Sequence, residues 1–233
     1  MNQDPKVIVA LDYADAKQAM QLVEQLDSNE CKLKVGKELF TACGPEFVKQ
    51  LVDLGYDVFL DLKFHDIPTT VRKAVAAASD LGVWMLNVHA LGGAQMVAAA
   101  REGIEQSSSQ RKPYLIAVTV LTSTNQQALD DLGFNCSIES LVNSLGTSAI
   151  NAGADGLVCS ALEVETLREN LGSSPLLVTP GIRPAGSAVD DQKRIMTPAK
   201  AIQSGSSYLV VGRPITQAEN PLQTLKDINQ SLT

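Results

Sequence analysis

The sequence predicts one (β/α)8 barrel that spans residues 1–233 as a single domain. Short apolar runs recur at intervals of roughly 20 to 35 residues, and helical patterns separate them. The chain has 233 residues, a size at which barrel folds commonly form one unit. Because strands that alternate with helices pair in parallel, eight such alternations predict a closed barrel.

The apolar runs are nearly continuous, which is typical of a parallel sheet covered by helices. The expected strands are Val7–Leu11, Leu33–Val35, Val58–Leu62, Met85–Val88, Leu115–Leu121, Gly156–Cys159, Leu176–Val178 and Tyr208–Val211.

Between these strands, apolar residues recur with helical spacing. The expected helices include Ala14–Leu26, Glu46–Leu54, Val71–Leu81, Ala94–Glu105, Ile138–Ala152 and Leu162–Asn170. A further helix is predicted from its capping residues, because Thr197 and Pro198 suit its first positions and Gly205 suits its end.

A doubly wound open sheet is the alternative fold. Its dinucleotide-binding form needs a glycine-rich turn after the first strand. Here the first strand ends instead in a carboxylate, Asp12, so the barrel is favoured.

Composition narrows the function classes. The formal net charge of −7 argues against general binding to nucleic acid or membranes. No apolar run approaches the ~18 residues of a membrane span, and the first residues do not resemble a signal peptide. The four cysteines lack CxxC spacing and the two histidines do not suggest a zinc site. We therefore expect a cytoplasmic enzyme with reduced thiols and no bound metal.

Chemically useful residues follow nearly every expected strand. In a barrel, the active groups collect at the C-terminal ends of the strands. These ends are occupied by Asp12, Lys34, Asp61, Lys63, His89, Thr122, Ser123, Ser160, Pro180, Gly181, Gly212 and Arg213.

The segment Asp61–Thr70 carries the most functional information. Asp61 and Lys63 are two residues apart on a strand and therefore share a face. Asp66 follows on the turn and Pro68 opens a helix. The alternative is a structural ion pair in which Asp66 caps that helix.

Lys34 ends the preceding strand, with Lys32 on its face and Leu33 and Val35 on the other. The alternative is an ordinary solvated lysine. Placed beside the Asp61 segment, however, Lys34 would complete a Lys-Asp-Lys-Asp array that balances its own charge. Such an array could stabilise a carbanion and supply a proton without a cofactor.

The last two strand ends suggest a phosphate site. Each places a glycine and then an arginine (Arg183, Arg213) at a strand terminus, where backbone N–H groups and guanidinium groups can bind an anion. The alternative is that these glycines only turn the chain. The polar stretch 184–191 could close over a ligand, and Gln192 could then donate a hydrogen bond to phosphate or base.

Three further residues are weaker candidates. His89 fits a barrel-wall histidine or a catalyst equally well, whereas we expect His65 to point away from Lys63 and to be structural. Thr122 could bind a heterocycle or cap the following segment.

Taken together, these motifs resemble those of the orotidine 5′-phosphate decarboxylases. The resemblance extends from about Lys6 to Thr216. The chain departs at Thr69, where many relatives carry asparagine. The matching segments are Val9–Asp12, Lys34–Gly36, Asp61–Thr70, Pro180–Arg183 and Val211–Pro214.

The resemblance implies decarboxylation of orotidine 5′-monophosphate to UMP and CO2, the last step of UMP synthesis, without a cofactor. It implies that Lys63 protonates the substrate carbon, with Asp61 near the substrate carboxylate and Asp66 orienting Lys63. It further implies a homodimer in which Asp66 and Thr70 reach the neighbouring site. The implied substrate-binding residues are Asp12, Lys34, Asp61, Thr70, Thr122, Pro180, Arg183, Gln192, Gly212 and Arg213.

Two alternative functions remain. One is a related metal-dependent barrel that acts on keto-sugar phosphates; such enzymes carry an acidic residue at the position of Lys34, where a lysine would repel the metal. The other is a non-catalytic barrel that binds a phosphorylated metabolite, for which an incomplete charged array would be expected.

Overall fold

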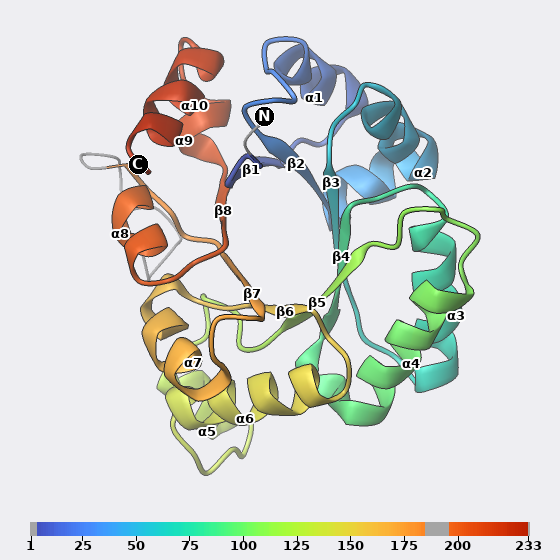
Figure 1. Cartoon of the computed structure of the whole chain (residues 1–233), viewed down its shortest axis with the longest axis vertical. Coiled ribbons are helices and arrows are strands. Elements are labelled where there is room, and N and C mark those ends of the chain that lie inside the picture. The colour runs from blue at the N-terminus through green and yellow to red at the C-terminus, as the bar shows by residue number, and fades with distance from the viewer. Residues whose placement is uncertain (1–3, 185–195, 233) are drawn as a thin grey trace.

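The computed structural model describes residues 4–184 and 196–232. Its eight strands form a closed barrel in which each strand is parallel to the next and β1 pairs with β8. Figure 1 shows the strands as an inner ring with the helices around it. The predicted barrel is therefore confirmed, and the open-sheet alternative is wrong.

The strands are β1 Val7–Leu11, β2 Lys32–Gly36, β3 Val58–Phe64, β4 Met85–His89, β5 Tyr114–Val118, β6 Gly156–Val158, β7 Leu176–Thr179 and β8 Tyr208–Val211. The α-helices are α1 Ala16–Val23, α2 Lys37–Asp53, α3 Pro68–Ser79, α4 Gly93–Gln106, α5 Gln126–Asp131, α6 Ile138–Asn151, α7 Val164–Leu171, α8 Pro198–Gln203, α9 Arg213–Thr216 and α10 Pro221–Gln230. In the described ranges, no helix has the length and apolar character needed to cross a membrane.

Two of the differences between predicted and observed elements have a clear structural reason. The helix expected from Glu46 starts earlier, at Lys37, and kinks at Gly44, whose φ is 71°. In the sequence, only the residues after the kink show regular helical spacing of apolar side chains, so only that part was predicted. The fifth strand ends at Val118 instead of Leu121, and the side chain of Thr119 donates to the Val158 carbonyl at 3.1 Å as the chain turns away.

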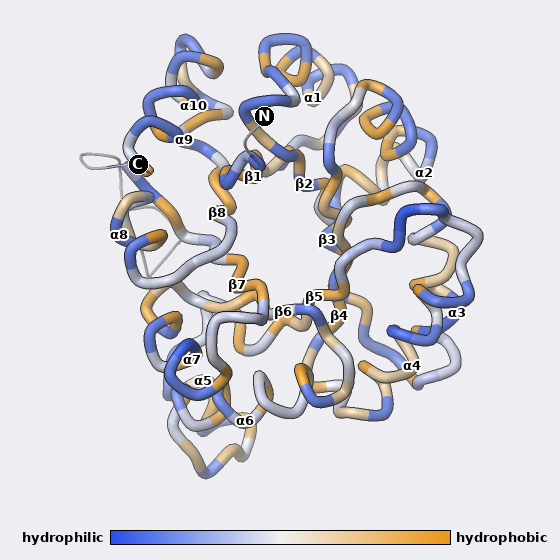
Figure 2. The backbone as a smooth tube through the Cα atoms, viewed as in Figure 1, coloured by the Kyte–Doolittle hydropathy of each residue, from blue (hydrophilic) through white to orange (hydrophobic). Residues whose placement is uncertain are grey.

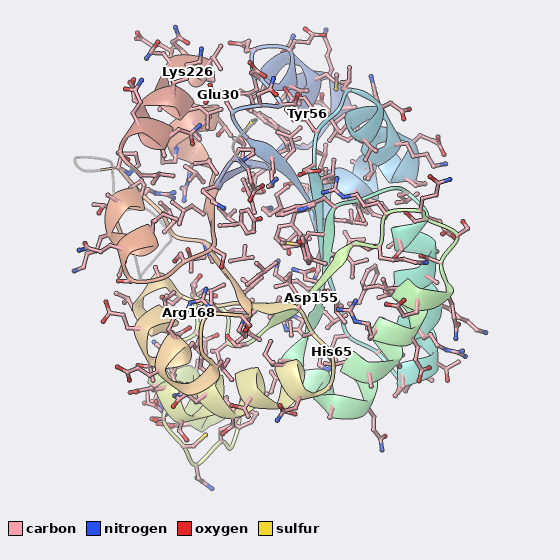
Figure 3. The ribbon with its side chains drawn as sticks, viewed as in Figure 1. Glu30, Tyr56, His65, Asp155, Arg168 and Lys226 are labelled. Carbon is pink, nitrogen blue, oxygen red and sulfur yellow. The ribbon has the colours of Figure 1, made fainter. Side chains whose placement is uncertain are left out.

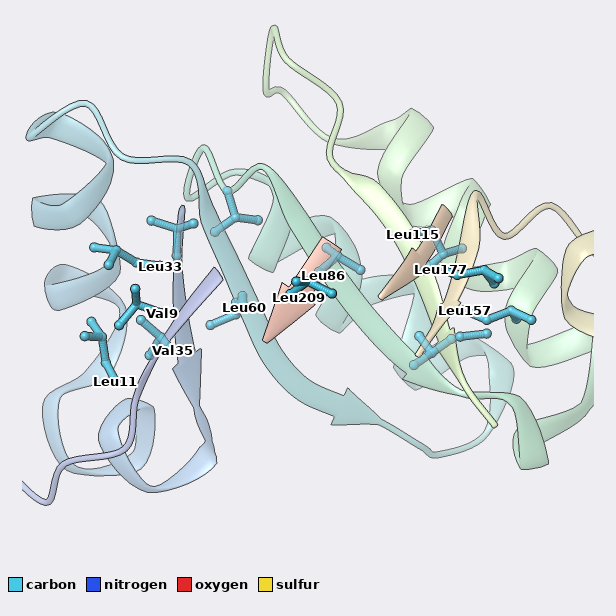
Figure 4. Close-up of a cluster of buried hydrophobic side chains, with 14 of the residues drawn as sticks. Val9, Leu11, Leu33, Val35, Leu60, Leu86, Leu115, Leu157, Leu177 and Leu209 are labelled. Atoms are coloured by element: carbon cyan, nitrogen blue, oxygen red, sulfur yellow. The ribbon is translucent and has the colours of Figure 1, made fainter. Parts of the chain in front are cut away.

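The barrel has two apolar layers because alternate residues of a strand face opposite sides. On β1, Val7, Val9 and Leu11 belong to the large cluster between strands and helices, whereas Ile8 and Ala10 belong to a smaller cluster inside the barrel. Figure 4 shows leucines and valines of the outer cluster on several strands. Figure 2 shows many hydrophobic positions on the strands and hydrophilic positions on the outer helices.

The N-terminal end of the barrel is closed by an ion-pair cluster. The Lys32 side chain is 2% exposed, and its Nζ lies 2.8 Å from Asp4 Oδ1 and 2.7 Å from Asp57 Oδ2. The same Nζ lies 4.4 Å from the centre of the Trp84 ring. These contacts fill the barrel at this end, so a ligand pocket must lie at the other.

Candidate active site

A pocket of about 710 Å3 lies at the C-terminal ends of the strands. This is the end at which barrels place their active groups. Nine of the residues predicted for the site line this pocket. They are Asp12, Lys34, Asp61, Lys63, Thr122, Pro180, Arg183, Gly212 and Arg213.

Asp61 is the centre of the charged array. Its Oδ1 lies 2.6 Å from Lys63 Nζ and its Oδ2 lies 3.4 Å from Lys34 Nζ. Lys34 also contacts Asp12 Oδ1 at 3.2 Å. One carboxylate is therefore held between two ammonium groups, and the alternative of Lys34 as a solvated lysine is wrong.

The surroundings of Asp61 keep it ionised. Burial alone would raise its pKa, but the charges of Lys34 and Lys63 and hydrogen bonds from Lys63 and Asn87 lower the pKa below the ordinary value. The array therefore combines a fixed anion with two cations at the wall of the pocket.

The strand that carries Asp61 and Lys63 is irregular. Leu60 pairs with Leu86 and Phe64 pairs with Val88, and the register shifts between these pairs. Lys63 has a φ of 52°, the one positive value among the described residues that are not glycine. A left-handed conformation costs such a residue about 1–2 kcal/mol. The predicted common direction of Asp61 and Lys63 is confirmed by their contact, but a bulge rather than a regular strand produces it.

Sequence reasoning missed Asn87, which lies opposite this bulge on β4. Its side chain is fully buried, donates to Asp61 Oδ1 at 2.7 Å and accepts from the Lys63 backbone N–H at 2.7 Å. The available signal was an amide inside the otherwise apolar run Met85–Val88. Buried amides are rarely left without partners.

The opposite side of the pocket carries the two arginines. Arg183 is 8% exposed and follows a bridge between Ile182 and Met196. Gly181 precedes it with a φ of 77°, a left-handed conformation that favours glycine. Arg213 opens α9 after Gly212. Gln192 and most of the stretch 184–191 lie outside the described residues.

Asp66 and Thr70 are not brought to this pocket within one chain. Both are exposed, and neither lines the cavity. Asp66 Oδ1 accepts the Ile67 backbone N–H at 2.6 Å. The N-cap of α3 is Ile67, so the alternative in which Asp66 caps this helix is wrong.

The two histidines also lie outside the pocket lining. Their ring centres are 5.5 Å apart, and Figure 3 places His65 toward the helices rather than at the barrel axis. Burial, together with electrostatic interactions with His65, Lys37 and Lys63, lowers the pKa of His89 to about 4. His89 is therefore neutral near pH 7.

Comparison with known proteins assigns the chain to a family. A model of the orotidine 5′-phosphate decarboxylase / HUMPS family matches residues 5–228. The chain belongs to this family. It is therefore an enzyme, and its relatives by name are decarboxylases, a type of lyase.

Two relatives show how complete the match to the decarboxylase family is. The orotidine 5′-phosphate decarboxylase of Psychromonas ingrahamii is 57% identical over 234 residues and is covered in full, as is this chain. That of Aliivibrio fischeri strain MJ11 is 57% identical over 230 residues, covering 99% of this chain and 98% of the relative.

Solved structures of the decarboxylase family share the fold. The Lactobacillus acidophilus orotidine 5′-phosphate decarboxylase superposes with a TM-score of 0.90 at 40% identity, over 99% of this chain and 100% of that one. The Pyrococcus horikoshii enzyme has a TM-score of 0.77 at 22% identity, over 97% of this chain and 98% of that one, a likeness of fold.

Proposed function

We propose that the chain decarboxylates orotidine 5′-monophosphate to UMP and CO2, the last step of UMP synthesis. The observation that carries the proposal is the Asp61 carboxylate held between Lys34 and Lys63 in the pocket wall. Family membership supports the choice of substrate. A pocket of about 710 Å3 is within the range of small-molecule sites.

The lining residues suggest one orientation of the substrate. The phosphate would lie against Arg183 and Arg213, whose guanidinium groups match its geometry. Thr122 would contact the pyrimidine edge, and Asp12 with Lys34 the ribose hydroxyls. The carboxylate-bearing carbon, C6, would then lie beside Asp61 and Lys63.

The proposed reaction needs one proton donor and no oxidant or reductant. The bond between C6 and the carboxylate carbon breaks, CO2 leaves, and the electron pair remains on C6. The Lys63 ammonium stabilises this charge and then gives C6 a proton. Its amine takes a proton back from solvent. Asp61, whose Oδ1 lies 2.6 Å from Lys63 Nζ, holds this side chain in place.

The phosphate would bind far from C6, so its binding would assist the reaction only by using remote binding energy to favour the transition state.

We also propose a homodimer with shared sites. Asp66 and Thr70 are exposed on the segment that follows Lys63, as is Ile67, which is 66% exposed. In the dimer, Asp66 would orient the partner's catalytic lysine. Mixing inactive Lys63→Ala and Asp66→Asn proteins then restores activity, because one site of each mixed dimer is intact. Mixtures that stay inactive after subunit exchange would contradict shared sites.

The proposed compartment is the cytoplasm. All four cysteines, two of them buried, are free, which suits a reducing environment.

The test is the ultraviolet absorbance of orotidine 5′-monophosphate incubated with the purified protein in excess EDTA. We expect rapid loss of the substrate band and formation of UMP, and no reaction with the Lys63→Ala variant. Absence of reaction with the unaltered protein would contradict the proposal. Addition of Mg2+ and keto-sugar phosphates would then test the metal-dependent alternative, and phosphate-ester binding without turnover would favour the non-catalytic one.

A further inference from the structure

The irregularity of β3 has a single counterpart on β4. Between the paired residues Leu60 and Phe64, β3 holds Asp61, Leu62 and Lys63, whereas β4 holds only Asn87 between Leu86 and Val88. Three residues therefore face one, and regular backbone pairing cannot continue here. The Lys63 backbone N–H, which lies in this gap, is bonded by a side chain instead, as expected because buried backbone donors are rarely left unpaired.

That side chain belongs to Asn87, which is fully buried. Its Oδ1 accepts from the Lys63 backbone N–H at 2.7 Å, and its Nδ2 donates to Asp61 Oδ1 at 2.7 Å. A backbone N–H only donates and a carboxylate only accepts, so these partners fix the orientation of the amide. One side chain thus binds the backbone of the lysine and the carboxylate of the aspartate.

We propose that Asn87 is a positioning residue that sets the distance between Asp61 and Lys63 for catalysis. The inference rests on the proposed decarboxylation. Asn87 does not line the pocket, so it acts through these two residues and not on the substrate.

Both ends of the pair depend on this amide. Asp61 Oδ2 faces Lys34 at 3.4 Å, while Oδ1 receives both Lys63 Nζ and Asn87, so the amide fixes the carboxylate on the side of Lys63. At Lys63 it holds the N–H of a residue whose φ is 52°. Without it, the backbone can relax out of the left-handed region and move Nζ away from the reacting carbon.

Two variants separate positioning from folding. Asn87→Leu keeps similar volume and removes both hydrogen bonds. Asn87→Asp keeps an acceptor for the Lys63 N–H and replaces the donor with a carboxyl group. Thr119→Val is the control, because Thr119 is also buried, at 1% exposed, does not line the pocket, and donates its hydroxyl to the Val158 carbonyl at 3.1 Å.

For Asn87→Leu we expect kcat to fall about 100-fold, as for a small misplacement of a reacting group. The affinity for UMP should change by less than about 3-fold, as expected when only a transition-state interaction is lost. Hydrogen exchange at the Lys63 amide should become faster. Thr119→Val should retain kcat and amide protection.

For Asn87→Asp the new carboxyl group faces Asp61 and Lys63 on β3 and Lys34 beyond them; β5 contributes the apolar Ile116, and His89 follows on the same strand. When protonated, the new group donates to Asp61 as the amide does; when ionised, it repels Asp61. We expect kcat relative to the unaltered protein to recover as pH falls from about 8 toward the titration range of carboxyl groups.

The inference is overturned if Asn87→Leu retains kcat within about 3-fold of the unaltered protein, since positioned groups contribute far more. It is also overturned if kcat and UMP affinity fall together in both this variant and Thr119→Val, or if Asn87→Asp matches the unaltered protein at every pH. An unaltered protein that does not decarboxylate the substrate would instead contradict the proposed function and remove this inference with it.

Discussion

The two ends of the barrel interior place the same chemical groups in different surroundings. Lys32 and Lys34 lie two residues apart on β2 and face the interior, and each contacts two aspartates. Lys32 lies under the Trp84 and Tyr208 rings and is 2% exposed. Lys34 instead lines a pocket of about 710 Å3.

This difference shows that the role of a buried ion pair depends on whether side chains cover it or a pocket exposes it. At the closed end, aromatic rings complete the packing and the charges have no access to a ligand. At the open end, no ring covers the lysine in the described structure, and its neighbours Asp61 and Lys63 reach the pocket. The closed end should therefore affect stability and the open end catalysis.

The largest expected effect is at the open end. Replacement of Lys63 by alanine should lower kcat by about 1,000-fold or more, because in the proposed reaction this residue supplies both the stabilising charge and the proton. UMP should still bind, since most of the pocket is retained. Turnover and UMP titration measure the two quantities, and near-normal kcat would exclude Lys63 as the proton donor.

The second effect is at the closed end. Lys32→Met should lower the free energy of unfolding by about 2 kcal/mol, because it leaves Asp57 partly buried without this partner while Asp4 can turn to solvent. Denaturant unfolding measures the loss, and kcat below the midpoint should stay near that of the unaltered protein. A large loss of kcat in the folded variant would contradict the separation of roles.

A smaller effect is expected at the rim of the open end. The Asp12 side chain is 68% exposed, so Asp12→Asn should change stability by less than about 0.5 kcal/mol. If Asp12 binds a ribose hydroxyl, KM should rise by about 10-fold, the effect of roughly one lost charged hydrogen bond. Steady-state kinetics at constant pH distinguish this from a fall in kcat alone, which would contradict a binding role.

The smallest effect concerns acid stability. Burial would raise the pKa values of Asp4 and Asp57, but hydrogen bonds and charges from Lys32 and their other partners lower both overall. The stability they contribute is present above the unfolded pKa of about 4 and is lost as pH falls through the lower folded values. Below about pH 4, the free energy of unfolding should therefore fall less steeply in Lys32→Met than in the unaltered protein. The difference between the two losses should be under about 1 kcal/mol. Denaturant unfolding at several pH values measures this dependence, and an equal change of unfolding free energy with pH in both proteins would contradict the prediction.

The sequence allowed the barrel and the charged array to be predicted, because alternation along a strand is a local property. Lys34, Asp61 and Lys63 follow apolar runs whose ends must meet at one rim. The role of Asn87 could not be predicted in this way. It depends on the register between β3 and β4 and on a bulge, which no local pattern in the sequence records.

The same limit applies to the closed end. Alternation placed Lys32 on the face of Lys34, but its partners Asp4, Asp57 and Trp84 come from three distant segments. The start of α2 was missed for a different reason, because the kink at Gly44 interrupts the helical period. The contributions of Asp66 and Thr70 stay predictions, since they concern a second chain.

The bulge in β3 has a consequence for protein engineering. Transplanting the lysine and aspartate side chains onto a regular barrel strand would copy the residues without their geometry. In this protein, the Lys63 backbone has a left-handed conformation and its N–H donates to the Asn87 side chain. The smallest transferable unit is the segment from Leu60 to Phe64 together with Asn87 of the adjacent strand. A design that transplants this segment together with Asn87 would also transfer the backbone geometry that brings the two side chains together.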